Sequence, residues 1–103
     1  MKCYILIKDD VPDEFAPVIA AHASLAMYLK WQDHEDVRKW VDGPFSKVVC
    51  RVGEGEWSKV KDESGCIPLT ESALDQREVA LVFRPREEWP KPFRFLRKWK
   101  PQA

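Results

Sequence analysis

The chain has 103 residues, of which 45% are hydrophobic and 33% charged, and its formal net charge at pH 7 is +0. This length and balance predict one globular domain over residues 1–103 and exclude a disordered or collagen-like chain. The neutral total also argues against a dedicated nucleic-acid binder, because such proteins are usually basic overall.

The composition predicts where the protein is located and which cofactors it lacks. The sequence has no apolar run of about eighteen residues, and its start, MKCYILIKDD, becomes charged too soon for a signal-peptide core. We therefore expect a cytoplasmic protein that does not bind membranes. Three cysteines without a CxxC pair, together with two histidines, predict no metal site. The four glycines form neither a GxGxxG nor a Walker motif, so we expect no nucleotide cofactor.

The first predicted element is a strand over residues 2–8, where the run CYILIK is rich in strand-forming residues. Its apolar residues occupy both alternating sets, which is typical of a strand that is covered on both faces. We therefore expect this strand to lie in the centre of the sheet.

A helix is predicted next, from about residue 14 to residue 31, with Asp13 as its N-cap and Pro17 near its first turn. Four residues then recur at helical spacing, which predicts that they form the buried face: Val18, His22, Leu25 and Leu29. This pattern places His22 on the inward side of the helix.

The remaining segments predict short helices and strands. DHEDVRKWV indicates a helix capped by Asp33, SKVVCRV a strand over residues 46–52, and EWSKVKDE one or two helical turns. GCIPLTES contains Pro68 and predicts a broken edge strand, whereas REVALVFRP predicts a regular strand. For REEWPKPFRFLRKWK we favour a helix over an edge strand, because Pro90 and Pro92 fit near a helix start. This order predicts an α/β domain with a mixed sheet of about four strands.

The first candidate for chemistry is His22, because histidine is the side chain that most readily exchanges a proton near neutral pH. Small residues surround it, namely Ala20, Ala21, Ala23 and Ser24. Either another backbone packs closely against the helix there, or a substrate approaches it. His22 is accordingly either a core histidine bonded to a carbonyl group or a general base.

A second candidate is the polar cluster Thr70, Glu71 and Ser72, where a predicted strand gives way to a loop. Strand ends commonly carry the ligand-binding residues of α/β sheets. If this cluster lies beside His22, Glu71 orients the imidazole, and Thr70 or Ser72 stabilises an oxyanion. The alternative is a turn whose polar side chains cap backbone groups. No GxSxG motif surrounds Ser72, which argues against a covalent nucleophile there.

The third candidate is the basic C-terminal segment. Residues 1–83 carry 10 Lys/Arg and 15 Asp/Glu, whereas residues 84–103 carry 7 and 2. Arg84, Arg94 and Arg97 are interspersed there with aromatic residues, a mixture that favours binding of RNA phosphates and stacking of bases. The alternative is a terminal helix with aromatic core residues and a solvated basic face.

The order of several motifs points to a known family. A hydrophobic strand ending in charged residues (YILIKDD) precedes a small-residue helix with a His-Ala step and a tyrosine six residues after the histidine (AAHASLAMY). A helix with a tryptophan follows, and then GPFSKVV leads into a strand. This ordered set covers residues 2–52, and residues 66–100 in outline. It resembles the type II peptidyl-tRNA hydrolase superfamily.

The resemblance implies a three-layer α/β/α domain that hydrolyses the ester bond between a peptide and tRNA. His22 and Lys47 match the histidine and the strand lysine of that family. Phe15 and Ile19 stand where the family has a lysine and a glutamine, and in this the chain resembles small uncharacterised relatives within the superfamily.

These observations predict a hydrolase of an ester or amide bond, with His22 as general base and Glu71 as its partner. The residues predicted to bind substrate are Lys47, Arg84, Arg94 and Arg97. The alternative is a catalytically inactive module that binds RNA or an acidic protein surface through the basic C-terminal segment. A third hypothesis is a homodimer formed through the apolar edge strand.

Overall fold

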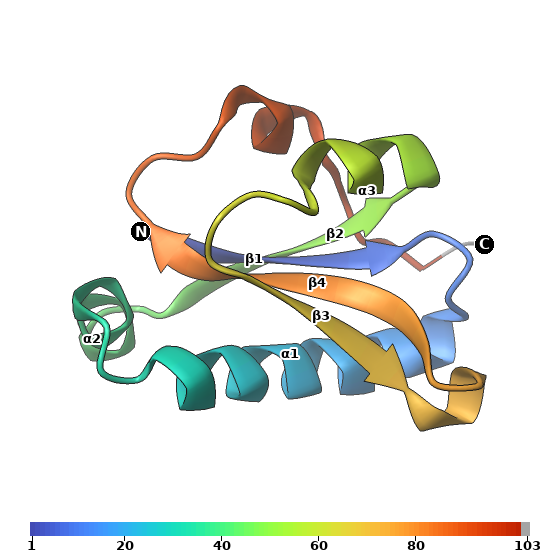
Figure 1. Ribbon diagram of the computed structural model, residues 1–103, viewed down its shortest axis with the longest axis horizontal. Coiled ribbons are helices and arrows are strands. Elements are labelled where there is room, and N and C mark those ends of the chain that lie inside the picture. The colour runs from blue at the N-terminus through green and yellow to red at the C-terminus, as the bar shows by residue number, and fades with distance from the viewer. Residues whose placement is uncertain (102–103) are drawn as a thin grey trace.

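In the part of the chain that the structure describes, five strands form one mixed sheet with helices on both of its faces (Figure 1). The computed structural model describes residues 1–101. The strands within them are β1 (Lys2–Lys8), β2 (Ser46–Val52), β3 (Cys66–Glu71), β4 (Arg77–Arg86) and β5 (Arg97–Lys98). Their spatial order is β3-β4-β1-β2-β5. The predicted α/β fold with a mixed sheet is therefore confirmed, with five strands in place of about four.

The central position predicted for β1 is confirmed. It pairs in parallel with β2 and antiparallel with β4, while β3 and β5 add antiparallel pairs at the two edges. Ile5 and Ile7 are buried on one face of β1, and Tyr4 and Leu6 are buried on the other. The uninterrupted apolar run of β1 follows from this burial on both sides.

The helical elements divide between the two faces of the sheet. They are α1 (Ala16–Trp31), α2 (Glu35–Asp42) and α3 (Glu54–Val60), with the 3-10 turns η1 (Asp13–Phe15), η2 (Ser72–Leu74) and η3 (Lys91–Phe95). The helices α1 and α2 cover one face, and α3 and η3 lie over the other (Figure 1). No helix within residues 1–101 has both the length and the apolar content that crossing a membrane requires.

Several boundaries agree with the sequence-based predictions. The strand β2 covers the predicted residues 46–52, and α3 supplies the short helix predicted over EWSKVKDE, although it runs from Glu54 to Val60. The strand β3 lies at the edge of the sheet and pairs with β4 on one side. The missing N–H of Pro68 therefore affects no second neighbouring strand in the described sheet.

The buried face predicted for α1 is wrong. The helix buries Ala16, Ile19, Ala23 and Met27, whereas Val18, Leu25 and Leu29 are 49%, 58% and 58% exposed. His22 is exposed as well. Apolar residues lie all around this helix, so two faces have helical spacing and the pattern does not distinguish them. The sheet takes the face that has small alanines, because these allow the helix to approach closely.

Two predicted helix caps are also wrong. Asp13 opens η1, and α1 begins only at Ala16, with Pro17 in its first turn. The cap of α2 is His34 instead of Asp33, since its Nδ1 accepts a hydrogen bond of 3.1 Å from the backbone N–H of Asp36. A neutral imidazole nitrogen can accept in this way, as a capping carboxylate would.

The C-terminal segment forms η3 and β5, so the helix favoured there is wrong. The strand β5 pairs with β2 through Arg97 and Lys98, and the backbone N–H of Trp99 donates to the carbonyl of Val49 at 2.8 Å. Buried Arg51 of β2 donates to the carbonyl of Lys100 at 2.7 Å. These long-range bonds outweigh the local preference for a helix.

Candidate functional site

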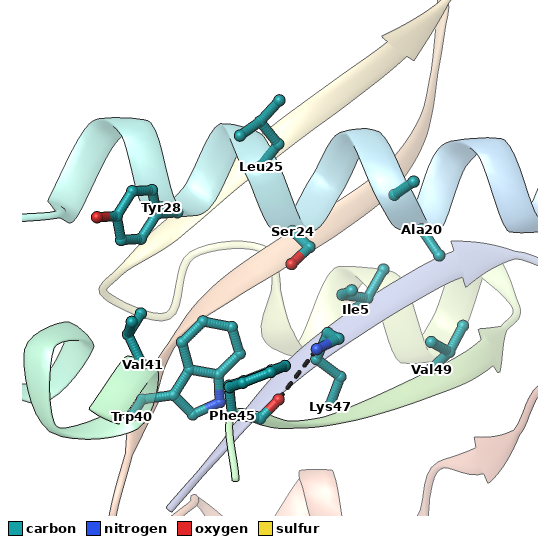
Figure 2. A pocket seen from close by; sticks show the side chains of 11 residues that line it. Ile5, Ala20, Ser24, Leu25, Tyr28, Trp40, Val41, Phe45, Lys47 and Val49 are labelled. Atoms are coloured by element: carbon teal, nitrogen blue, oxygen red, sulfur yellow. Dashed lines mark hydrogen bonds between the residues drawn. The ribbon is translucent and has the colours of Figure 1, made fainter. Parts of the chain in front are cut away.

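A groove of about 560 Å³ lies between α1, α2 and the first half of β2 (Figure 2). Ile5 and Val49 form its floor on the sheet. Ala20, Ala21 and Ser24 line it from α1, and their short side chains leave the space open. The small residues around His22 thus have two roles, since Ala23 packs on the sheet while the other three border the groove.

The opposite wall of the groove is aromatic. Trp40, at the end of α2, donates its indole N–H to the carbonyl of Ser46 at 2.8 Å. Its ring meets the Phe45 ring edge to face, with centroids 6.1 Å apart. Phe45 has a backbone φ of +37°, which is unusual for a bulky residue. The backbone N–H of Phe45 donates to the carbonyl of Trp40 and holds this turn in place.

Among the described residues that line the groove, Lys47 alone carries a positive charge. Its ammonium donates to the carbonyl of Phe45 at 3.0 Å and lies 4.8 Å from the Phe45 ring centroid and 5.3 Å from that of Trp40 (Figure 2). Within residues 1–101 it forms no ion pair, although an ammonium has three donors. Lys47 therefore has two donors left for a ligand.

The buried thiol behind the groove is unreactive. Cys3 is paired in register with Lys47 across β1 and β2. Burial raises the pKa of the Cys3 thiol to about 12, although the nearby Lys47 ammonium acts to lower it. The thiolate, which is the nucleophilic form, is therefore scarce at neutral pH.

His22 lies outside the groove. Its side chain is exposed and has no hydrogen-bonding partner in residues 1–101, although Ala21 and Ser24 on the same helix line the groove. No bond in this part of the chain connects it to Thr70, Glu71 or Ser72.

The cluster after β3 consists of turn-stabilising contacts. The Glu71 carboxylate accepts a hydrogen bond of 3.3 Å from the backbone N–H of Ala73 and caps η2. The Thr70 hydroxyl donates to the side-chain carbonyl of Gln76 at 3.4 Å. Asp75 and Gln76 have φ values of +58° and +57°, which reverse the chain before β4. These contacts are those of a turn with a capping side chain, which is the alternative to a catalytic cluster.

The predicted arginines do not share one surface. The Arg84 guanidinium lies 5.4 Å from the ring of Trp31, at the end of α1, on the side of the sheet that α1 covers. Arg94 belongs to η3 on the other side, and Arg97 pairs with Glu56 at 3.5 Å. Of the predicted substrate-binding residues, only Lys47 lines the groove.

No group of three or more His, Cys, Asp or Glu side chains in residues 1–101 is arranged to hold a metal ion. Burial raises the pKa of both the Cys50 and Cys66 thiols to about 11.

The aromatic wall is what the sequence-based reasoning missed. Trp40 and Phe45 flank the segment Val-Asp-Gly-Pro, and aromatic residues on both sides of such a turn are the available signal. Their meeting at a groove depends on how α2 packs against β2, which local sequence does not determine.

A scan against models of known protein families finds no match for this chain, and a search of curated proteins finds no significant match.

Proposed function

We propose that the protein is a binding module whose groove holds a ligand with an apolar body and a carboxylate, specifically an N-acylated amino acid. The observation that carries this proposal is the ammonium of Lys47, which forms no ion pair within residues 1–101 and lies in a groove of about 560 Å³ with otherwise mostly apolar walls. Ligand sites are typically concave and apolar, with a few polar groups that fix orientation. This composition suits a ligand that is charged at one end only.

Apolar burial in the groove and a hydrogen bond to Lys47 both contribute to the binding free energy of such a ligand. Burial of roughly 100 Å² of apolar ligand surface contributes about 2.5 kcal/mol, and a hydrogen bond to a charged group about 1.5–3 kcal/mol. The Trp40 and Phe45 rings offer edges and faces to an apolar side chain, and the Ser24 hydroxyl offers a further polar contact. Binding costs offset part of this sum, so we expect a weak but specific affinity.

The resemblance to the type II peptidyl-tRNA hydrolases supports the same ligand class. An N-acylated amino acid is the acyl part of a peptidyl-tRNA, and Lys47 stands where that family has its strand lysine. We propose that the chain is a divergent relative with the family's three-layer arrangement.

A matched pair of probes tests the groove. N-acetyl-L-phenylalanine and its primary amide differ in the charge at one end, and we expect about tenfold tighter binding of the acid. Lys47→Met keeps an apolar stem and should abolish this preference, whereas Lys61→Met, exposed and outside the groove, should retain it. Calorimetry or NMR titration measures both. Equal affinity of the native protein for acid and amide contradicts the proposal.

Hydrolysis of an ester or amide is the second candidate function. It is favoured by the position of Ala21 and Ser24, which place a bound acyl group against the helical turn that carries His22. In this proposal His22 acts as general base, and the loop with Thr70, Glu71 and Ser72 approaches it. N-acetylated aminoacyl-tRNA is the substrate to test: His22→Ala should lower the rate at least about tenfold, and His34→Ala should not. Equal rates for the two variants contradict this role.

Binding of RNA through the C-terminal segment is a further proposal, supported by Arg94, which forms no ion pair in residues 1–101. Affinity for single-stranded RNA should fall steeply with added salt, and charge reversal at Arg94 and Arg97 should abolish it. Binding that salt does not weaken contradicts this proposal.

Self-association is proposed through β3, because this strand forms an edge of the sheet. Size-exclusion chromatography with light scattering measures the mass. A monomeric mass at all accessible concentrations contradicts it.

A further inference from the structure

We propose a second ligand site, on the opposite face of the sheet from the groove, that binds a phosphate group between Lys2, Arg94 and Lys98 over the hydroxyl of Tyr4. This site is separate from the groove and does not require an extended nucleic-acid strand. It accepts inorganic phosphate or the terminal phosphate of a larger molecule, because the same oxygens are recognised in both.

The site is a cavity of about 350 Å³ between the sheet and η3. Lys2 comes from β1, Lys98 from β5 and Arg94 from η3, so three elements distant in sequence contribute one cation each. Tyr4 and Cys50 belong to the face of the sheet that borders the cavity.

The first observation is the phenol of Tyr4. The residue is only 6% exposed, and its ring packs edge to face against Trp89 and Phe93, with centroids 4.7 Å and 5.2 Å away. Its hydroxyl has no hydrogen-bonding partner in residues 1–101, yet its oxygen is not sealed from solvent. A tyrosine buried to this extent usually has a partner for its hydroxyl. An acceptor bound in the cavity supplies one.

The second observation is that the cations of the cavity lack ion-pair partners. Neighbouring arginines are paired, Arg86 with Glu63 at 3.2 Å and Arg97 with Glu56 at 3.5 Å. By contrast, none of the three cations of the cavity forms an ion pair in the described part of the chain. Like charges gathered around one cavity repel, and an anion between them relieves that repulsion.

The Cys50 thiol, which lines the cavity, lies within electrostatic reach of two of the three cations. Burial raises the pKa of Cys50 to about 11, with Glu56 as a further raising influence, while Lys98 and Lys2 both lower it. The two lysines thus lie close enough to the same floor residue to act on it together.

Two nearby acidic residues indicate where in the cavity the phosphate is expected. Glu87 and Glu88 line an adjoining cavity together with Lys2, Tyr4 and Arg94. They repel an anion on that side, so the ligand is expected on the side of Lys98. A phosphate monoester suits this arrangement better than a carboxylate, because three terminal oxygens can accept bonds from several directions at once.

The test of the site is a titration with inorganic phosphate at constant ionic strength, followed by the backbone N–H signals of Val48 and Cys50 in NMR spectra. Saturable binding is expected. Tyr4→Phe retains the packed ring and should weaken it about fivefold or more, and Arg94→Gln and Lys98→Gln about tenfold each. Lys61→Gln removes a charge elsewhere on the surface and should leave affinity unchanged. Non-saturable shifts, or equal losses in all four variants, overturn the site.

A second titration distinguishes the sources of the phosphate, with a short RNA that carries either a 5′-phosphate or a 5′-hydroxyl. Tighter binding of the phosphorylated strand, with the advantage removed by Tyr4→Phe, supports a terminal phosphate as ligand. Equal binding of the two strands, with saturable inorganic phosphate, supports a free phosphate at the same site.

Discussion

The guanidinium of Arg51 lies 3.6 Å from the centre of the Trp99 ring, so a charged residue of β2 is stacked directly on an aromatic residue that follows β5. The same guanidinium donates to the Asp13 carboxylate at 2.9 Å and to the Lys100 carbonyl at 2.7 Å. One buried cation therefore connects η1, the sheet and the C-terminal segment.

This connection predicts a large loss of stability in Arg51→Met. The variant removes the ion pair, the carbonyl bonds and the stacking, and the free energy of unfolding should fall by about 2–4 kcal/mol. Chemical denaturation measures the change. Arg38→Met is the matched control, because Arg38 and Asp33 form an exposed pair at 3.7 Å that should contribute less than about 0.5 kcal/mol. Similar losses in both variants contradict the role given to Arg51.

Substitutions on the buried and the exposed face of α1 should change the free energy of unfolding by different amounts. Met27 is fully buried, so Met27→Ala should lower the free energy of unfolding by about 2–4 kcal/mol. Leu29 is mostly exposed, and Leu29→Gln should change it by less than about 0.5 kcal/mol. Thermal or urea unfolding checks both. A large loss in Leu29→Gln indicates that this face is covered in solution.

The turn before β2 predicts a variant that separates binding from stability. Phe45→Asn removes one of the two rings of the aromatic wall but keeps a residue type that tolerates positive φ, so the free energy of unfolding should change by less than about 1 kcal/mol. Affinity for N-acetyl-L-phenylalanine should drop about fivefold or more, since half of the aromatic wall is lost. If affinity is unchanged while stability falls, Phe45 has a structural role only.

The buried thiols predict a loss of stability in alkali. Burial raises the pKa of Cys3 from 9.0 to about 12 and that of Cys50 from 9.0 to about 11. Thiolates therefore form more easily in the unfolded chain, and unfolding is favoured as the pH rises above about 9. The stabilising contribution is complete below that pH and is lost as the pH rises towards 11–12.

Cys3→Ala tests this pH dependence. Its free energy of unfolding should decline less steeply than that of the native protein between about pH 9 and pH 11, whatever its value at neutral pH. Denaturant titrations across this range measure the two slopes. Identical slopes show that the Cys3 thiol does not contribute.

The parts of the fold that the sequence predicts are those set by local pattern. β1 has apolar residues in both alternating sets and is central, and Pro68 lies in an edge strand, as expected. The pattern of α1 is ambiguous because its two faces are both apolar at helical spacing, and only the fit of Ala23 against the sheet decides between them. Because the other face of α1 packs on the sheet, His22 lies at the surface and not in the predicted interior.

The candidate site was predictable only in part. Lys47 is predicted through the family resemblance, and Ala20, Ala21 and Ser24 from the run of small residues on α1. These four residues line the groove, whereas Ala23 packs on the sheet. Trp40 and Phe45 were not predicted, because their position depends on the packing of α2 and on a turn with positive φ. The site around Tyr4 depends on η3 and β5 folding back over the sheet, in a segment for which a helix was expected.

The position of Arg51 along the chain has a consequence for synthesis on the ribosome. Its ion-pair partner, Asp13, precedes it, whereas its stacking and carbonyl partners, Trp99 and Lys100, lie about fifty residues later, so most of the sheet emerges before this arginine can be covered. A nascent chain that stalls before Trp99 exposes an unpaired edge of β2. We therefore expect β5 to pair with β2 late in folding, and a chain that stalls before this segment should be susceptible to proteases.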